Sequence, residues 1–201
     1  MISKRTGFFH AAFVSAALLF GSAAGCGPAW VVVKQANPSP FAAQTTFSVD
    51  AVAYEGLKVG GKAEADYLAE KKPEQVEAWK GDLTKLNATF AENLVKAGKG
   101  LQISNGPGAA PAAYTIKPMV TFIEPGAWAL VVNIPSEVRM TLRIADDKGN
   151  VVDEVVSSAK YATSSVMGVP LNPTVTDRLN ECGKMLGESA AAYLRSRAGL
   201  K

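Results

Sequence analysis

EVRMTLRIADDKGNVVDEVVSSAKY, residues 137–161, joins two runs of β-forming sequence through a short polar segment. In the first run, apolar residues occupy every second position from 138 to 144, and Arg139, Thr141 and Arg143 stand between them. This period of two predicts a strand with one buried and one solvated face. The linking residues 146–150 include Gly149, which can adopt the positive φ of a tight turn. The stretch therefore predicts an antiparallel hairpin.

Two segments outside the hairpin have the periodicity of amphipathic helices. Residues 73–100 begin with Pro73, which suits a first helical turn, and finish at Gly98 and Gly100. Residues 171–197 show the same three-and-four spacing near the C-terminus. The two apolar stripes are Val76, Trp79, Leu83, Leu86, Phe90 and Leu94 in the first segment, and Val175, Leu179, Cys182, Leu186, Ala190, Tyr193 and Leu194 in the second. We interpret Trp79 and Cys182 as core residues.

Further strands are predicted at residues 45–54 and 114–124, and residues 103–114 are predicted to form a connecting loop. Residues 30–34 fit either an extended tether or an edge strand. The order strand, helix, three strands, helix predicts an α+β two-layer sandwich. We expect a largely antiparallel sheet of about four to five strands, with two long amphipathic helices on one face.

The N-terminus has the organisation of a secretory signal peptide. Lys4 and Arg5 precede an apolar run at residues 8–20, and small residues then lead to Cys26. The apolar run of about 13 residues is shorter than the roughly 20 that a membrane-spanning helix needs. The sequence therefore predicts export without a permanent transmembrane helix.

Ala23-Ala24-Gly25-Cys26 resembles the bacterial lipobox, although Ala23 stands where leucine is usual. The resemblance implies cleavage before Cys26 and attachment of diacylglycerol and palmitate chains to this residue, so that the membrane becomes a partner. Gly27 implies, by analogy with enteric bacteria, an outer-membrane location facing the periplasm. The expected organisation is a signal peptide (1–25), a lipidated N-terminus with tether (26–44) and an α+β domain (45–201). The alternative is a plain secretory peptide cut near Ala24.

Charge and residue types narrow the possible functions. Removal of residues 1–25 leaves 19 basic and 18 acidic residues, which is no footprint for nucleic acid. The single histidine, His10, leaves with the signal peptide, so histidine-based catalysis, metal sites and haem sites are excluded. Ser157 and Lys160 match an S-x-x-K pattern, which we interpret as a chance match because it falls in a predicted strand. We therefore expect no catalytic residues, no metal and no cofactor.

Residues 124–137, EPGAWALVVNIPSE, are too apolar for an ordinary surface loop. One interpretation is a further strand or flap that covers the core. The other is an apolar patch at the sheet edge that contacts a partner or a membrane. The candidate interface residues are Trp128, Leu130, Val131, Val132 and Ile134.

The whole layout resembles small bacterial cell-envelope lipoproteins, such as the auxiliary lipoproteins of envelope transport systems. The residues behind this resemblance are Gly25-Cys26, the strand from Val120 to Gly126, and the hairpin LRIADDKGNVVDE (residues 142–154). The resemblance implies a non-enzymatic accessory, binding or assembly module with an unidentified envelope partner. Two alternatives stay open, namely a periplasmic hydrolase that uses Ser157 and Lys160, and a passive structural lipoprotein.

Overall fold

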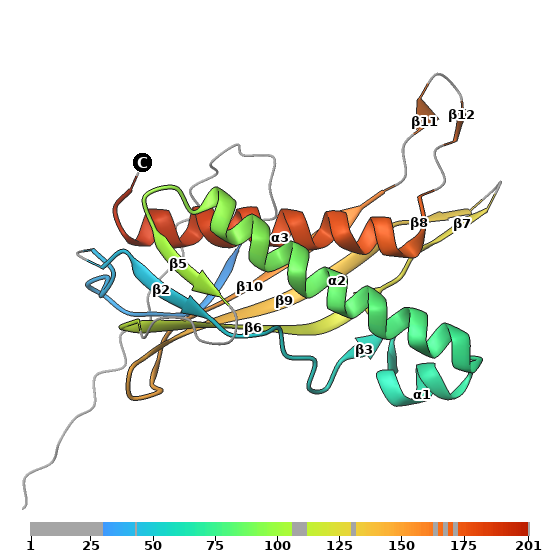
Figure 1. The fold of residues 1–201 in the computed structure, drawn as a ribbon, viewed down its shortest axis with the longest axis horizontal. Helices are drawn as coiled ribbons and strands as arrows, with labels where there is room; N and C mark the ends of the chain where they lie inside the picture. The colour runs from blue at the N-terminus through green and yellow to red at the C-terminus, as the bar shows by residue number, and fades with distance from the viewer. Residues whose placement is uncertain are drawn as a thin grey trace, which may run out of the picture.

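The computed structural model describes residues 30–42, 44–105, 112–129, 132–162, 165–166, 169–170 and 173–200. A twisted sheet and two long helices form two layers (Figure 1). The elements are β1 (Val31–Gln35), β2 (Thr46–Val49), β3 (Lys58–Val59), β4 (Lys62–Ala63), α1 (Glu64–Ala69), α2 (Pro73–Ala97), β5 (Gln102–Asn105), β6 (Tyr114–Glu124), β7 (Ala127–Ala129), β8 (Val132–Ile134), β9 (Ser136–Asp146), β10 (Val151–Tyr161), β11 (Ser165–Val166), β12 (Val169–Pro170) and α3 (Val175–Arg197).

The predicted hairpin is confirmed as β9 and β10. These strands pair antiparallel from Ala145 and Val151 at the turn to Ser136 and Tyr161 at the far end. In the turn, the Asp146 amide donates to the Asn150 carbonyl at 2.9 Å, and Gly149 has φ +84°. A glycine is needed here because a side chain at such a φ is strained.

The main sheet has eight strands, with the path β1-β10-β9-β6-β2-β5 and with β3 and β4 beside it. It is a mixed sheet, because β2 runs parallel to both β5 and β6, and β3 runs parallel to β6. The predicted α+β class is confirmed. The expected four to five strands were too few, and the sheet is mixed where a largely antiparallel one was expected. Part of the difference lies in β5, which occupies residues assigned to a loop. Helix α2 carries the chain back to the end of the sheet at which β2 begins, so that β5 can run parallel to β2.

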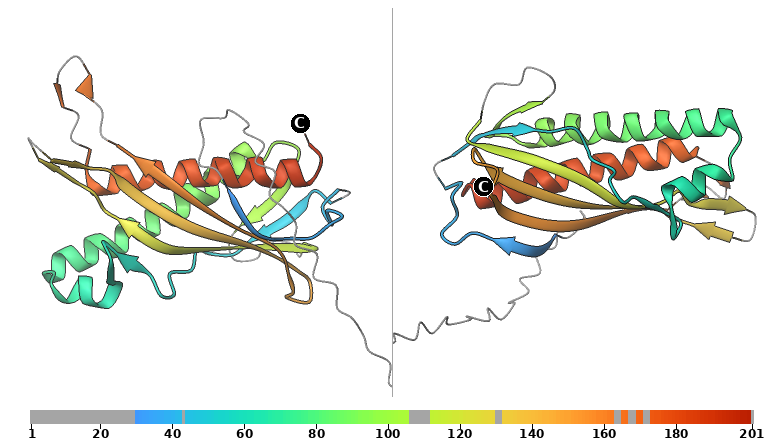
Figure 2. Two further views of the ribbon diagram at one scale, coloured as in Figure 1. Left: turned by 180° about the vertical axis from the view of Figure 1, so that it is seen from behind. Right: turned by 90° about the horizontal axis from the view of Figure 1, so that it is seen from below.

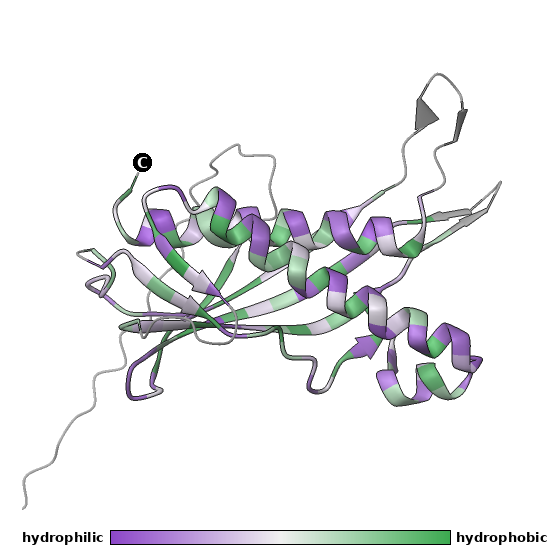
Figure 3. Cartoon of the chain, in the orientation of Figure 1, coloured by the Kyte–Doolittle hydropathy of each residue, from purple (hydrophilic) through white to green (hydrophobic). Residues whose placement is uncertain are grey.

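Helices α2 and α3 lie side by side on one face of the sheet, as expected (Figure 2). Hydrophobic and hydrophilic residues alternate in bands along both helices (Figure 3). Leu86, Phe90 and Leu94 of α2 are fully buried, and so are Leu179 and Leu186 of α3. Trp79 and Cys182 are buried in the same core, which confirms their interpretation as core residues.

Residues 31–35 form an edge strand, the alternative to a tether that the sequence left open. Strand β1 pairs antiparallel with β10, and its register shifts between Val32 and Lys34. Just before the strand, the Trp30 indole donates to the Ser189 carbonyl of α3 at 2.9 Å. The folded domain therefore includes residues ahead of the strand that was expected to open it. Within the described part of the chain, no helix is both long and apolar enough to cross a bilayer.

Candidate functional site

Cys26, the predicted lipidation site, lies outside the described residues, so its attachment stays a prediction. The described chain begins four residues later at Trp30. The Trp30 ring lies against Tyr193 of α3, with ring centroids 6.2 Å apart. The segment that follows Cys26 in the sequence is thus fixed to the domain from Trp30 onward.

A buried polar cluster holds β1 against β10 and α3. Asp153 is fully buried and accepts hydrogen bonds from Arg197 Nε at 2.7 Å, the Tyr193 hydroxyl at 2.7 Å and the Ala36 amide at 2.9 Å. Arg197 also donates to the Ala36 carbonyl at 2.7 Å. Burial lowers the pKa of Arg197, but the hydrogen bond and charge of Asp153 outweigh this effect and raise it. We call Asp153, Tyr193, Arg197 and Ala36 the N-terminal clasp.

Sequence reasoning missed this clasp. The available signal was the place of Asp153 in the alternating pattern of β10. Its side chain lies on the same buried face as those of Val155 and Ala159. A carboxylate at an inward position needs a partner, because a buried unpaired charge is strongly unfavourable. The partner Arg197 is 44 residues away in the sequence, so only the folded chain identifies it.

The sheet face opposite the helices carries a second charged cluster, centred on Glu137. Its carboxylate accepts from Arg139 at 2.6 Å and from the Ser158 hydroxyl at 2.8 Å, and it pairs with Lys160 at 3.2 Å. Burial alone would raise the pKa of Glu137, but the hydrogen bonds from these three groups outweigh it and lower the pKa to about 2. The single carboxylate of Glu137 therefore balances one of the two positive charges of Arg139 and Lys160.

Ser157 and Lys160 do not form a catalytic pair in this geometry. Ser157 is 2% exposed and lies on the helix side of β10 with Val155 and Ala159. Lys160 lies on the other face, where it pairs with Glu137. Side chains three positions apart in a strand leave it on opposite sides, so the lysine cannot reach the serine hydroxyl.

Cys182 is a buried thiol. Its Sγ lies 3.6 Å from the Ala159 carbonyl oxygen and 3.8 Å from that of Ser136. Burial raises the pKa of this thiol to about 12, which keeps it protonated at neutral pH. A protonated, inaccessible thiol is a poor nucleophile and metal ligand.

Within the apolar segment 124–137, β7 and β8 pair as a second hairpin, which extends past the end of the main sheet (Figure 1). Trp128 lies in β7 and Val132 in β8, whereas Leu130 and Val131 fall outside the described residues. Ile134 is 43% exposed. The backbone is thus a hairpin, and the role of its apolar side chains as an interface stays a prediction.

The base of this hairpin is held firmly. Gly126 has φ +74°, and a Cβ there would lie 2.7 Å from the Ile134 carbonyl oxygen. The Ser136 hydroxyl donates to the Pro125 carbonyl at 2.6 Å, and the buried Arg178 of α3 donates to the same oxygen at 3.1 Å. The α3 helix therefore fixes the direction in which the hairpin leaves the domain.

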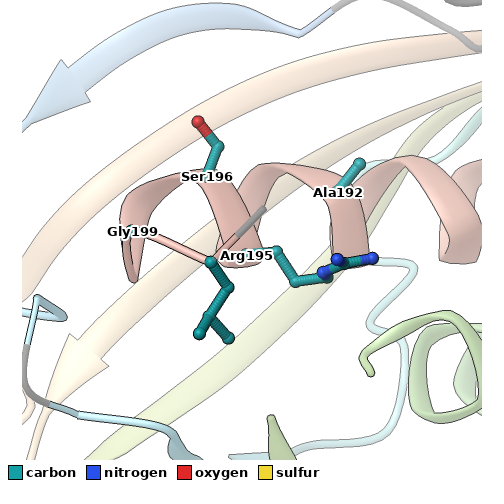
Figure 4. A pocket seen from close by; sticks show the side chains of 5 residues that line it. Ala192, Arg195, Ser196 and Gly199 are labelled. Carbon is teal, nitrogen blue, oxygen red and sulfur yellow. The ribbon is translucent and has the colours of Figure 1, made fainter. Parts of the chain in front are cut away.

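Surface hollows lie near the C-terminal ends of the helices. One of about 410 Å³ is lined by Ala192, Arg195, Ser196, Gly199 and Leu200. Figure 4 shows that Ser196 and Arg195 leave α3 on different sides. These five residues include no carboxylate, imidazole or thiol, so the hollow has no nucleophile and base in contact. A second hollow, of about 730 Å³, lies between α2 and β5, with Ala91, Val95 and Ile103 among its lining residues.

No family model and no curated protein matches this chain. Solved structures with low identity do match. One is a DUF330 protein from Xanthomonas campestris, with 10% identity over 86% of this chain and 94% of that one and a TM-score of 0.44. Another is the PelC dodecamer of Paraburkholderia phytofirmans, with 12% identity, 82% and 97% coverage and a TM-score of 0.41. A minor lipoprotein of Acinetobacter baumannii has 11% identity, 77% and 94% coverage and a TM-score of 0.35.

Proposed function

We propose that this chain is a lipid-anchored protein of the bacterial envelope, and that its α+β domain is a non-enzymatic accessory, binding or assembly module. The observation that carries the proposal is the N-terminal sequence, in which a charged start, a short apolar run and small residues lead directly to Cys26. Acyl chains on this cysteine would hold the protein at a membrane without crossing it, since each buried methylene contributes about 0.8 kcal/mol. The outer membrane, facing the periplasm, is the proposed location.

The short connection between Cys26 and the folded domain supports an anchoring role. Four residues separate Cys26 from Val31, the first residue of β1. The N-terminal clasp then joins β1 to β10 and α3 through Asp153 and Arg197. An anchor at Cys26 would therefore hold the whole domain close to the membrane surface.

The arrangement of the candidate catalytic groups favours a binding module over the hydrolase alternative. Ser157 and Lys160 lie on opposite faces of β10. Cys182 is buried, and its pKa is raised to about 12. Within the described residues, no group of three or more His, Cys, Asp or Glu side chains is placed to hold a metal ion. An accessory role needs none of these groups.

Mass spectrometry of the mature N-terminal peptide tests the proposal. We expect the chain to begin at Cys26 and to carry the added mass of the acyl chains, and we expect Cys26→Ser to release the protein from membranes. A mature chain that starts at an unmodified residue would refute lipid anchoring, as would a Cys26→Ser variant that stays membrane-bound. Crosslinking in cells would then identify the partner of the wild-type protein and distinguish an accessory module from a passive structural one.

A further inference from the structure

Three consecutive valines on β1 are exposed at the edge of the sheet. The exposed fractions are 65% for Val31, 39% for Val32 and 59% for Val33. Single exposed apolar residues are ordinary, but an edge strand with several of them side by side is a potential contact surface. Side chains alternate along a strand, so Val31 and Val33 share one face of β1, and Val32, which pairs with the buried Val155, lies on the other. We call Val31 and Val33 the valine strip.

The strand itself disfavours pairing with a strand of another protein. The register of β1 against β10 shifts between Val32 and Lys34, which marks a bulge. Lys34 follows the strip, and its Nζ donates to the Val151 carbonyl of β10. Bulges and edge lysines are the devices by which proteins block edge-to-edge pairing. Strand β1 is therefore poorly suited to pair with a strand of another protein. The exposed valines are better explained by contact with a different kind of partner.

The short stretch of chain between Cys26 and β1 points to the membrane as that partner. Val31 is the fifth residue after Cys26, so the chain between them spans at most about 18 Å when fully extended. Because its acyl chains lie in the hydrocarbon of the bilayer, Cys26 is held at the level of the lipid headgroups. Val31 is thus confined to within this short distance of the membrane surface, and Val33, two residues further on, to within about 25 Å, even when the connecting residues are stretched.

We propose that the valine strip rests on the bilayer that holds the Cys26 acyl chains, and that this contact orients the domain on the membrane. This inference rests on the lipid anchoring proposed above. Apolar side chains gain free energy in the interfacial zone, while water and headgroups at that depth still hydrate the free edge of the strand. The cationic Lys34, which is exposed, suits the anionic headgroups beside the strip. Because the N-terminal clasp ties β1 to α3, the orientation of the strip is transmitted to both layers.

A fluorescent label on the strip tests the contact. Bimane is attached to Val31→Cys or Val33→Cys in the full lipidated protein, which is reconstituted in vesicles of phosphatidylethanolamine, phosphatidylglycerol and a brominated phosphatidylcholine. Cys182 is buried and Cys26 is acylated, so the introduced thiol is the one that reacts. The matched control is Val95→Cys, because Val95 is a valine of similar exposure, 41%, on α2 in the helix layer.

We expect the brominated lipid to quench the labels at positions 31 and 33 several-fold more strongly than the label at position 95. Equal, weak quenching at all three positions would overturn the inference. Shielding that depends on protein density and not on the brominated lipid would also overturn it, in favour of contact with a second copy. The mass of the N-terminal peptide in the same sample separates the two proposals. Absent acyl chains refute the anchoring and the inference together, whereas acylated protein with unquenched labels refutes the inference alone.

Hydrogen exchange gives a second readout that leaves the valine strip unsubstituted. In vesicles, the amides of residues 31–35 should exchange more slowly than in the soluble Cys26→Ser protein. The amides of residues 92–97, at the C-terminal end of α2, should exchange equally in both. Unchanged exchange at residues 31–35 would contradict membrane contact.

Discussion

Gly187 of α3 lies so close to Phe90 of α2 that a Cβ on the glycine would stand 2.5 Å from the Phe90 carbonyl oxygen and 2.9 Å from the Leu94 amide nitrogen. One turn earlier, Gly183 meets the Leu86 carbonyl oxygen in the same way, at 3.1 Å. The two helices therefore pack through backbone at these points, and the absence of side chains on the two glycines sets their separation.

Gly187→Ala should destabilise the protein. The new methyl group would force the helices apart, and overpacking typically costs about 1–3 kcal/mol. The control is Gly81→Ala in α2, where a Cβ would meet nothing within 4 Å. That change should stabilise the fold by about 0.5–1 kcal/mol, because alanine favours a helix more than glycine does. Urea denaturation measures both, and a Gly187→Ala variant that gains stability like the control would contradict the packing described.

Asp153→Asn should be far more costly than Glu154→Gln. Both carboxylates bind an arginine, but Asp153 is fully buried and its partner Arg197 is 14% exposed, whereas Glu154 and Arg143 are 23% and 43% exposed. Removal of one charge from a buried pair typically costs about 3–5 kcal/mol, and an exposed pair contributes about 0–1 kcal/mol. Thermal unfolding of the two variants gives the comparison. Equal losses of stability would show that the N-terminal clasp does not hold the domain together.

Glu137 should make the stability of the domain depend on pH in the acidic range. Its folded-state pKa of about 2 lies below the ordinary value of 4.5, so the native state binds this proton less readily than the unfolded state. The contribution is therefore complete above pH 4.5 and disappears as the pH falls from 4.5 towards 2. It amounts to at most about 3 kcal/mol, and to less because Arg139 and Lys160 are more than half exposed.

Glu137→Gln should remove this part of the pH dependence. Chemical denaturation at several pH values measures it, with Glu77→Gln as the control because Glu77 forms an exposed ion pair with Lys80 on α2. The control should keep the wild-type slope between pH 4.5 and 2. An unchanged slope in Glu137→Gln would show that other carboxylates dominate acid unfolding.

Cys182 should resist alkylation in the folded protein. Burial raises the pKa of this thiol to about 12, and it lies in the core between α3 and the sheet. Iodoacetamide at neutral pH should therefore modify it only after addition of denaturant. Rapid modification of the native Cys26→Ser variant, which retains Cys182 as its only cysteine, would contradict this assignment.

Ile134→Ser should lower the melting temperature much less than a core substitution does, and it should weaken any contact that the β7–β8 hairpin makes. Ile134 is 43% exposed, so its replacement removes less buried surface than the replacement of a fully buried core residue. Crosslinking in cells compares the partners of this variant with those of the wild type. A buried control, Leu186→Ala, should lower stability by about 2–5 kcal/mol. A fall in melting temperature for Ile134→Ser as large as that control would favour the covering flap over the interface.

The local elements follow from short-range signals in the sequence. The β9–β10 hairpin depends on alternating residues and on Gly149 at a positive φ, all within one continuous stretch. Helix α3 begins with Thr174 and Asp177, whose side chains each bond to the backbone amide of the other residue. Such patterns can be read from the sequence because the interacting groups are only a few residues apart.

The tertiary structure decided what depends on distant partners. The parallel pairing of β2 with β5 joins residues 56 positions apart, and nothing in either strand specifies its direction. The pairing of Asp153 with Arg197 and the attachment of β1 to β10 likewise depend on long-range contacts. From the sequence, residues 30–34 fitted either an extended tether or an edge strand, because a short valine-rich segment is extended in both. The place of this segment at the edge of the sheet, with three valines exposed, is determined by its hydrogen bonds with β10 and by the N-terminal clasp, to which α3 contributes.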